Sequence, residues 1–417
     1  MLLMSPFRRS TQSRLRLLPL LIVLCAFLEV CWVRHNIRTV ERANTRDWRI
    51  RKSATTEQRK KIYIASPLWN AERMLRGPWG NWSASLLEVA KDFGPENVFV
   101  SILEGGSYDS TKDALGELDA ELGRWGVRRS ITMEEETHED FMAQDPGSEG
   151  WVKTREGNTE LRRIPFLAKL RNRTLQPLRE LWAKGERFDY VLFLGDVIFN
   201  SEEISTLINT NDGDYAAACS LDFAHPPLYY DTFVLRDQFT DPTIQTTWPY
   251  FRSRESRHAM KRHLPVPVSS CWNGIVSMPA HIFTTPKTPL TFRALPDKIA
   301  AHHFEASECC LIHADNPLFG TKPVLLNPAV RVGYNHSAYD AVHGRDAGLS
   351  FYDVLEGLWG NRGRRWVSMW FHSDRGRQRH LLRAVGAVGR EVGVGEVAPW
   401  CVVDEMQVIA ADGWRHV

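Results

Sequence analysis

Strand-like and helix-like segments alternate where the globular part of this chain begins. "KIYIAS", "NVFVSI" and "VRRSIT" have the apolar, β-branched character of short strands. "LLEVAKDFG" and "DSTKDALGELDAELGRWG" lie between them, carry apolar residues at helical spacing and end at a glycine. A β-α-β-α-β order favours a parallel sheet covered by helices, so we predict an α/β fold with a Rossmann-type sheet.

Residues 17–33, "LLPLLIVLCAFLEVCWV", have the composition of a membrane span. As a helix they would rise ~25 Å, a little short of a ~30 Å hydrocarbon core. Arginines stand on both sides of the segment, so the charge asymmetry is weak. A cleaved signal peptide is the alternative, but no small-x-small cleavage site follows. We therefore expect an uncleaved, single-pass type II signal anchor, with residues 1–16 as a cytoplasmic tail and residues 34–60 as a polar stem leading to a luminal domain.

Further features agree with a luminal location. Sequons of the form N-x-[ST] begin at Asn81, Asn172 and Asn335. An odd number of cysteines follows the anchor, so one thiol stays free unless it pairs between chains, and the pairing cannot be read from the sequence. They are Cys219, Cys271, Cys309, Cys310 and Cys401. The formal net charge of +2 offers no concentrated basic stripe, so nucleic acid is not an expected partner.

Acidic residues follow several of the predicted strands. Glu104 and Asp109 stand in "EGGSYDST", Asp196 ends the apolar run "FDYVLFLGDVIF", and Asp222 follows in "DYAAACSLD". Ligands of such a sheet bind beyond the carboxyl ends of its strands, and acids on one rim are typical of a divalent cation that bridges phosphates. The alternatives are a helix cap at Asp109 or Ser110, and an ordinary salt bridge at each acid.

Longer stretches resemble the fungal capsule-associated α-1,3-mannosyltransferases, glycosyltransferase family 69. The stretches that carry the resemblance, in the family's order, are "LRRIPFLAKLRN", "FDYVLFLGDVIF", "NDGDYAAACSLDF", "YYDTFVLRD", "PVPVSSCWNGIVSM", "HHFEASECCLIHADNPL" and "NPAVRVGYN". The resemblance implies a GT-A-like domain with a mixed, mainly parallel sheet over residues 61–340, and a C-terminal extension, residues 341–417, packed on it.

The resemblance also implies an activity and a location. It implies a Golgi membrane enzyme that moves mannose from GDP-mannose to a mannose-containing acceptor in an α-1,3 linkage. The reaction would retain the α configuration with the help of Mn²⁺, and it would serve fungal capsule, cell-wall or surface glycan synthesis. The acceptor glycan, the partner subunits and the oligomeric state stay open.

Residue roles on the donor side follow from the same resemblance. Glu104 would contact the base or ribose, with Asp109 beside it, and Asp196 would hold the metal. Arg163, Lys169 and Arg171 would lie on the nucleotide side, where arginine grips phosphate bidentately. A solvated helix face is the alternative for these basic residues, and we expect at most two to touch the donor.

Some positions depart from the family's metal motif. Leu194 stands where a literal Asp-x-Asp motif needs a carboxylate, and Gly195 stands where the family pattern has Asn. The literal triplet that begins at Asp212 precedes the next strand and is typical of a turn. Asp222 is therefore the preferred second contact for the metal or the sugar.

Two later segments supply groups for the sugar and the reacting carbon. In "SCWNGIVSM", Trp272, Asn273 and Gly274 resemble the stretch that meets the transferred sugar, whereas a core strand with a buried Trp is the alternative. In "HHFEASECCLIHAD", the carboxylate placed near the anomeric carbon would be Glu308, with Glu305 second, and Asp222 is a further catalytic candidate. Retention needs either a carboxylate nucleophile or a front-face reaction in which the donor phosphate accepts the proton. His313 would complete the metal shell, unless it is an ordinary buried histidine.

Two other functions fit the same segments. A related transferase would use a different nucleotide-sugar, such as a UDP-sugar, because base contacts are hard to read from one sequence. A non-catalytic carbohydrate-binding or scaffold relative in polysaccharide assembly would explain the incomplete metal motif.

Overall fold

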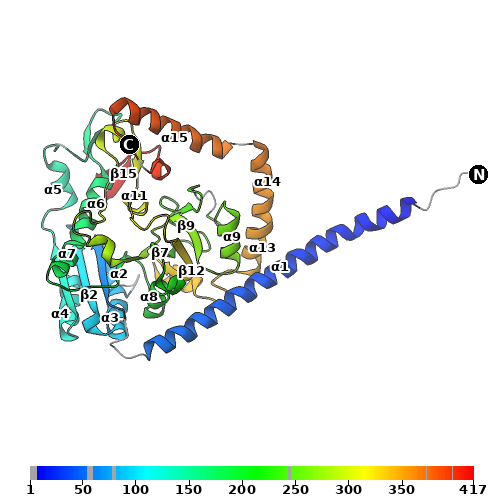
Figure 1. The fold of residues 1–417 in the computed structure, drawn as a ribbon, viewed down its shortest axis with the longest axis horizontal. Coiled ribbons are helices and arrows are strands. Elements are labelled where there is room, and N and C mark those ends of the chain that lie inside the picture. The colour runs from blue at the N-terminus through cyan, green and yellow to red at the C-terminus, as the bar shows by residue number, and fades with distance from the viewer. Residues whose placement is uncertain are drawn as a thin grey trace, which may run out of the picture.

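The computed structural model describes residues 7–53, 60–77, 81–147, 149–242, 246–371, 373–396 and 398–417. Its centre is a nine-stranded sheet with the order β3-β2-β1-β6-β10-β7-β12-β9-β8 (Figure 1). The strands are β1 Ile62–Leu68, β2 Val98–Glu104, β3 Arg128–Met133, β6 Tyr190–Leu194, β7 Ala217–Phe223, β8 Arg236–Asp237, β9 Val266–Ser270, β10 Ile275–Pro279 and β12 Val324–Gly333. Strands β9 and β10 run antiparallel to the other seven strands of this sheet. The predicted mixed, mainly parallel α/β sheet is confirmed.

Helices cover both faces of the sheet. They are α2 Glu72–Leu75, α3 Trp82–Phe93, α4 Thr111–Arg124, α5 His138–Ala143, α6 Arg163–Thr174, α7 Gln176–Ala183, α8 Ser201–Ile208, α9 Arg254–Lys261, α10 Asp297–Ala300, α11 Glu308–Ala314 and α12 His336–Val342. Ile62 and Ile64 of β1 share an apolar core with α3, α4 and α8, whereas Tyr63 and Ala65 face a second core with α6, α7 and α11. Strands β2, β6, β7 and β10 are buried at every position, which explains their nearly continuous apolar sequences.

The remaining elements lie at the two ends of the chain and beside the sheet. They are α1 Phe7–Lys52, α13 Phe351–Leu355, the π-helical turn Glu356–Gly360, α14 Asn361–Phe371, α15 Ser373–Val392, and the short strands β4 Trp151–Lys153, β5 Thr159–Leu161, β11 Glu305–Ala306, β13 Val402–Val403, β14 Gln407–Ala410 and β15 Gly413–His416. Short 3-10 turns are Pro95–Asn97, Thr210–Gly213, Ala280–Phe283 and Pro399–Cys401.

Helix α1 differs from the predicted arrangement of a span followed by a polar stem. Among the described residues it is the one helix long and apolar enough to cross a membrane, judged by length and composition, with a hydropathy of 1.8. It continues unbroken through Arg34 to Lys52 and lies along the domain (Figure 1). Val30, Val33 and Ile37 are fully buried in the domain's core. Their three- and four-residue spacing forms a narrow apolar face that the many charges around it conceal in the sequence.

The C-terminal residues are tied to the same body. Cys310 pairs with Cys401, and β13 adds to β11 as an antiparallel partner. A second disulfide joins Cys219 of β7 to Cys271. Cys309 is the buried free thiol of the five, as the odd count requires.

Candidate active site

Asp196 lies directly beyond the carboxyl end of β6. Its side chain is exposed, and in the described part of the chain no hydrogen bond or ion pair to another side chain holds its carboxylate. Surrounding protein atoms nevertheless strip enough water from it to raise its pKa, an effect that its own backbone amide and nearby Arg171 partly offset. Asp196 is therefore an accessible carboxylate rather than a residue packed into the apolar interior.

A close contact between two glycines sets the backbone beside Asp196. The Gly195 N–H donates to the Gly274 carbonyl at 2.8 Å. A Cβ atom on Gly195 would lie 2.9 Å from that oxygen, and one on Gly274 would lie 2.8 Å from Val332 Cγ2. Gly274 also has a φ of +81°. Gly195, which stands where the family pattern has Asn, thus fits the packing of this chain. A larger residue at this position would push β10 away from β6.

Two further carboxylates, Asp222 and Asp231, lie next to each other at the end of β7. Asp222 accepts from Tyr334 Oη at 3.0 Å, from Asn273 Nδ2 at 3.4 Å and from the Asp231 N–H at 3.2 Å. Burial raises the pKa of Asp222 to about 7, and the charge of Asp231 adds to the shift. The pKa of Tyr230 is also raised, mainly by burial of this side chain. The negative charges of Asp222, Asp196 and Asp231 add to that shift. The three acids therefore surround one small region.

Asp222→Asn should flatten the dependence of thermal stability on pH. The pKa of Asp222 is about 7 in the folded chain and near the ordinary aspartate value of 3.8 when unfolded, so the folded state binds the proton more tightly. Its stabilising contribution is complete below the unfolded pKa and is lost as pH rises through about 7. We expect the wild-type Tm to fall more steeply than that of the variant between pH 5 and 8, measured by scanning calorimetry. Equal slopes would contradict this assignment.

Arg171 joins the predicted acid Glu308 to the predicted sugar platform Trp272. Its Nε donates to Glu308 Oε1 at 2.9 Å, and its guanidinium carbon lies 4.6 Å from the centroid of the Trp272 ring. Glu308 is 2% exposed at the first position of α11. Burial and the neighbouring Cys309, Glu308 and Asp196 all act on the pKa of Arg171, whose net shift is upward. The structure therefore brings Asp196, Arg171 and Glu308 together.

Arg163 lies on the same helix and is held by the C-terminal tail. Its Nη1 donates to Gln407 Oε1 at 2.5 Å, and its guanidinium carbon lies 4.4 Å from the Trp414 ring centroid. Burial lowers its pKa, and the charge of Glu308 opposes that effect. The sequence analysis did not predict that Gln407 and Trp414 of the C-terminal tail would hold Arg163. It also missed Asp231, although this acid stands in the family-like stretch "YYDTFVLRD".

Glu104 and Asp109 occupy different environments in the turn after β2. One oxygen of Glu104 accepts from the Ser107 N–H, whereas its Oε2 is buried and has no partner in the structure. Asp109 accepts from the backbone N–H groups of Thr111, at 3.0 Å, and Glu72, at 3.2 Å. Asp109 therefore organises the turn, which was the alternative reading for it, and Glu104 keeps an unused acceptor.

The glycine between these acids is required by the fold. A Cβ atom on Gly106, whose φ is +74°, would lie 2.0 Å from the Glu136 carbonyl oxygen. Gly106 is therefore needed for the close approach of the chain's own backbone at residue 136.

Glu305, the second candidate for the catalytic carboxylate, is held in a buried ion pair. Both of its oxygens accept from Arg162, at 2.9 and 3.0 Å, and both side chains are fully buried. Burial raises the pKa of Glu305 to about 7, against the pull of Arg162. Both of its oxygens are engaged in this ion pair, which favours a structural role for Glu305 over the expected catalytic one.

His313 and Lys169 also lie apart from the carboxylates. His313 is fully buried, its Nε2 lies 2.6 Å from the Cys271 carbonyl, and burial lowers its pKa to about 4. The potential metal ligands grouped with it are Cys219 and Cys271, which form a disulfide, so this group offers no free thiolate and the role of His313 as a metal ligand stays a prediction. Lys169 is exposed and lines a groove of about 960 Å³ on the outer side of α6, and Asp196 does not line that groove.

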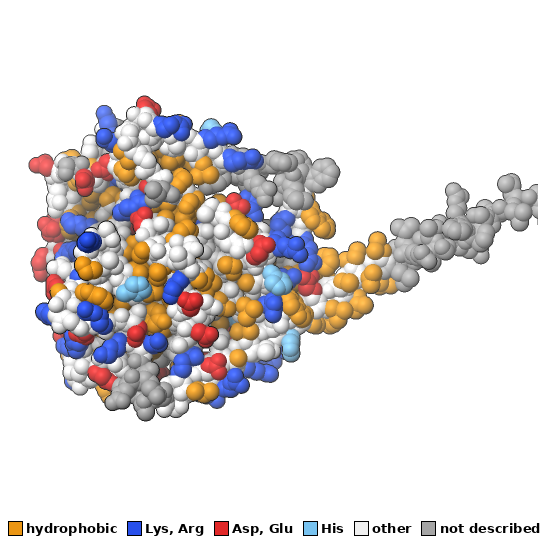
Figure 2. Space-filling view, viewed as in Figure 1, with side chains coloured by type: hydrophobic (Ala, Val, Ile, Leu, Met, Phe, Trp, Pro, Cys, Tyr) orange, Lys and Arg blue, Asp and Glu red, His pale blue; other side chains and the backbone are white. Residues whose placement is uncertain are grey.

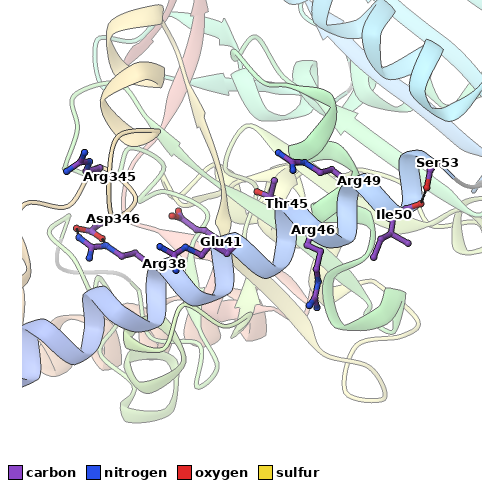
Figure 3. A pocket seen from close by; sticks show the side chains of 10 residues that line it. Arg38, Glu41, Thr45, Arg46, Arg49, Ile50, Ser53, Arg345 and Asp346 are labelled. Atoms are coloured by element: carbon purple, nitrogen blue, oxygen red, sulfur yellow. Dashed lines mark hydrogen bonds and ion pairs between the residues drawn. The ribbon is translucent and has the colours of Figure 1, made fainter.

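A second large groove is also lined by none of the candidate site residues. It has a volume of about 920 Å³ and runs along the C-terminal half of α1, between this helix and residues 345–346 (Figure 3). Its lining residues are Arg38, Glu41, Arg42, Thr45, Arg46, Arg49, Ile50, Ser53, Arg345 and Asp346. Groove volume alone therefore does not identify the site, which rests on the chemistry of its side chains.

The sequons differ in how far their side chains are free to react. Asn172 Nδ2 donates to the Phe292 carbonyl at 2.8 Å, and its Oδ1 accepts from the Phe292 N–H at 2.9 Å. Asn335 caps α12, where its Oδ1 accepts from the Ala338 N–H at 2.9 Å. Asn81 is exposed and makes no side-chain capping bond. The prediction of glycosylation at Asn172 conflicts with its buried amide pairing.

We expect glycopeptide mapping of the secreted-pathway protein to find Asn81 occupied and Asn172 unoccupied. The reason is that the side-chain amide of Asn172, which donates through Nδ2 and accepts through Oδ1, must leave both hydrogen bonds to the Phe292 backbone before Nδ2 can carry a glycan. Mass spectrometry after deglycosylation in heavy-oxygen water measures both sites in one digest. Full occupancy at Asn172 would contradict the folded arrangement of α6.

Comparisons with known proteins give one family and several distant structures. The family model described as Cryptococcal mannosyltransferase 1 matches residues 61–315. Alpha-1,3-mannosyltransferase CMT1 of Cryptococcus neoformans var. neoformans serotype D is 26% identical over 273 residues, which cover 60% of this chain and 53% of that protein. The chain therefore spans about half the length of this curated relative.

Similar solved structures include two glycosyltransferases with low scores. The mannosyltransferase PcManGT from Pyrobaculum calidifontis, in complex with GDP-Man and Mn²⁺, has a TM-score of 0.35 and 9% identity over 74% of this chain and 67% of its own. S. aureus TarS has a TM-score of 0.38 and 12% identity over 80% of this chain and 49% of its own. Such distant likenesses assign no site residue.

Proposed function

The chain belongs to the Cryptococcal mannosyltransferase 1 family, and on that basis we propose that it transfers mannose from GDP-mannose to a mannose-containing glycan in an α-1,3 linkage. The observation that carries this proposal is the accessible carboxylate of Asp196 beside Arg171, at the carboxyl edge of the sheet. Donor sites of open α/β sheets lie at this edge. The product would be a fungal capsule, cell-wall or surface glycan.

The donor's base would be met by Glu104. Its buried Oε2 lacks a donor in the described structure, and a buried acceptor without a partner costs free energy. The Watson–Crick edge of guanine presents two adjacent N–H donors, whereas that of uracil presents one between two carbonyl oxygens. A carboxylate therefore matches guanine better, since it would face a uracil carbonyl with its own negative charge.

The diphosphate would lie between α6 and Asp196. Arg163 and Arg171 extend from this helix toward Glu308 and the acids, and each carries a fixed positive charge held by its own packing contacts. Pre-placed charges of this kind lower the barrier for a departing anion because they need no reorganisation during the reaction.

The protein would supply only part of the ligands of a divalent cation at this site. Oxygen ligands suit Mn²⁺, and Asp196 offers an uncommitted carboxylate. No set of three potential ligand atoms from His, Cys, Asp or Glu includes Asp196 in the described ranges of the chain. Asp196 would therefore supply one ligand and the donor's phosphates others, as is common for hard cations at nucleotide sites. When bound, the ion would supply positive charge to the leaving diphosphate.

Glu308 would position groups rather than attack the sugar. Its carboxylate is nearly inaccessible and is bonded to Arg171 at 2.9 Å. A paired and buried carboxylate is a weak nucleophile, so the retaining reaction would proceed on the front face, where the donor phosphate accepts the acceptor's proton. Trp272, at 9% exposure and stacked on Arg171, would then limit the depth of the sugar site.

The activity test is a donor comparison with the full-length chain. We expect turnover with GDP-mannose, Mn²⁺ and an α-linked mannobiose acceptor, and none with UDP-sugars, with the new linkage read by NMR. Glu104→Gln should raise the KM for GDP-mannose about tenfold, the equivalent of one charged hydrogen bond of ~1.5 kcal/mol. Asp109→Asn, in the same turn, should leave KM nearly unchanged.

Other outcomes of this comparison would replace the proposal. Turnover with a UDP-sugar would identify a different donor. Binding of GDP-mannose or mannobiose without turnover would favour the scaffold function. The two disulfides and helix α1 are consistent with a luminal, membrane-anchored domain, and we propose a type II orientation in the Golgi membrane.

A further inference from the structure

Helix α1 is fastened to the domain along most of its C-terminal half. Arg34 Nε donates to Asp346 Oδ2 at 2.6 Å, and Arg38 Nη2 donates to the same oxygen at 3.0 Å. Farther along, Glu41 accepts from Arg331 Nη2 at 2.8 Å. Together with the buried apolar face of the helix, these ion pairs fix how far α1 protrudes from the domain.

Helix α1 begins at Phe7, but its apolar section is short for a membrane span, because Arg14 and Arg16 stand directly before it in the sequence. Figure 2 shows apolar side chains uncovered where the helix leaves the body, and the exposed large apolar residues of this part lie in residues 18–28. That stretch rises only about 16 Å, at about 1.5 Å per residue, against a hydrocarbon core of about 30 Å. If α1 spans a bilayer, the edge of the domain around Glu29 must therefore lie at the depth of the lipid headgroups.

The edge of the domain at this depth is formed by α13 and α14. Phe351 of α13 contacts Phe27 of α1, with ring centroids 5.9 Å apart. Arg362 of α14 donates to both oxygens of Glu29, at 2.7 and 2.8 Å, and Lys261 donates to the same carboxylate. A carboxylate near the membrane is costly unless it is paired, and here two cations pair with it. In Figure 1, α14 runs across the direction of α1, on the side from which α1 leaves the body.

This edge carries exposed aromatic residues beside cations. Tyr352 is 68% exposed, and Trp366 is 61% exposed one helical turn after Arg362, on the same side of α14. Val367 is 57% exposed. Amphipathic aromatic rings with arginine and lysine nearby are typical of the zone where protein meets lipid headgroups.

From these observations we propose that the domain is seated directly on the luminal bilayer surface, with α13 and α14 in the headgroup region. The seat, defined as Phe351, Tyr352, Trp366 and Val367, replaces the expected stem as the element that sets the height of the active site above the membrane. The inference goes beyond the proposed sugar transfer and rests on α1 crossing a bilayer. A seated domain would act on acceptors presented close to the membrane surface.

Depth-dependent fluorescence quenching tests the seat in the full-length chain. Single cysteines are introduced as Tyr352→Cys and Trp366→Cys, in a background of Cys25→Ser and Cys31→Ser, and are labelled with NBD. The chain is placed in phosphatidylcholine nanodiscs that contain lipid with a shallow doxyl group. Val23→Cys, in the protruding part of α1, reports whether the helix is in the bilayer. Trp125→Cys replaces a residue that is 48% exposed after α4 and serves as the water-exposed control.

We expect blue-shifted emission and at least threefold stronger quenching at positions 352 and 366 than at position 125. Quenching at position 23 with none at 352 and 366 would overturn the seat while leaving the anchor intact. Absence of quenching at position 23 would overturn both. Shielding at 366 that depends on protein concentration and not on doxyl lipid would identify a second copy of the chain as the occupant, and would also overturn the proposal. None of these outcomes depends on mannosyl transfer, so failure of the seat and failure of the proposed function are distinguishable.

Discussion

We expect Asp196→Ala to reduce kcat/KM for the proposed mannosyl transfer about 100-fold or more, while the folded chain stays at least as stable as the wild type. The loss follows because Asp196 is the accessible carboxylate proposed to hold the cation against the departing diphosphate, and fixed electrostatic groups of this kind carry effects of that size. Stability should not fall, because desolvation by nearby protein atoms raises the pKa of the exposed Asp196. Its ionised form therefore weakens the fold as pH rises through the raised pKa, and alanine removes that penalty.

The measurement combines steady-state kinetics with calorimetry in the absence of donor. Asp212→Ala is the matched control, since Asp212 belongs to the literal Asp-x-Asp triplet but lies in the 3-10 turn Thr210–Gly213. We expect this control to keep wild-type kcat/KM. Loss of activity in the Asp212 variant with retention in the Asp196 variant would transfer the proposed metal role from one aspartate to the other.

Arg162→Met lowers the free energy of unfolding by about 3–5 kcal/mol, because it leaves Glu305 buried without its cation. Both partners are inaccessible to solvent, and Arg162 also donates to the Leu295 carbonyl at 3.2 Å. Urea unfolding followed by circular dichroism measures the change. The double variant Arg162→Met, Glu305→Leu should recover much of the loss, since neither buried charge of this pair then remains.

A surface pair supplies the control for this second prediction. Arg415 bonds to Glu160 at 2.7 Å, with 45% of its side chain exposed, so Arg415→Met should change stability by less than about 1 kcal/mol.

If Glu305 were catalytic, Glu305→Gln in an otherwise folded chain would reduce kcat about as strongly as Asp196→Ala. We expect instead that it mainly lowers Tm.

The sequence predicted the elements of the sheet well because their signals are local. Apolar residues at strand or helical spacing mark β1, α3, β2, α4 and β3, and strands buried on both faces appear as apolar runs. The same reasoning placed Asp196 and Asp222 at strand ends. It was less successful at α1, where a narrow buried face is spread among many charges.

The role of a residue could be predicted only where its contacts are with residues close to it in the sequence. Asp109 bonds to Thr111 two residues away and forms the turn that its position allowed. Glu305, by contrast, is neutralised by Arg162, which is 143 positions distant, and Arg163 is held by Gln407, 244 positions distant. His313 is placed against Cys271 by the packing of α11 under a disulfide.

By itself, the sequence determined the order of strands and helices, the apolar N-terminal segment and which carboxylates exist at the ends of strands. Tertiary structure alone decided that Asp196 stays accessible, that Glu104 keeps a free oxygen and that Glu305 does not. The physical reason is that backbone conformation follows from neighbours within a few residues, whereas the charge and availability of a carboxylate depend on which donors the packed chain brings to it.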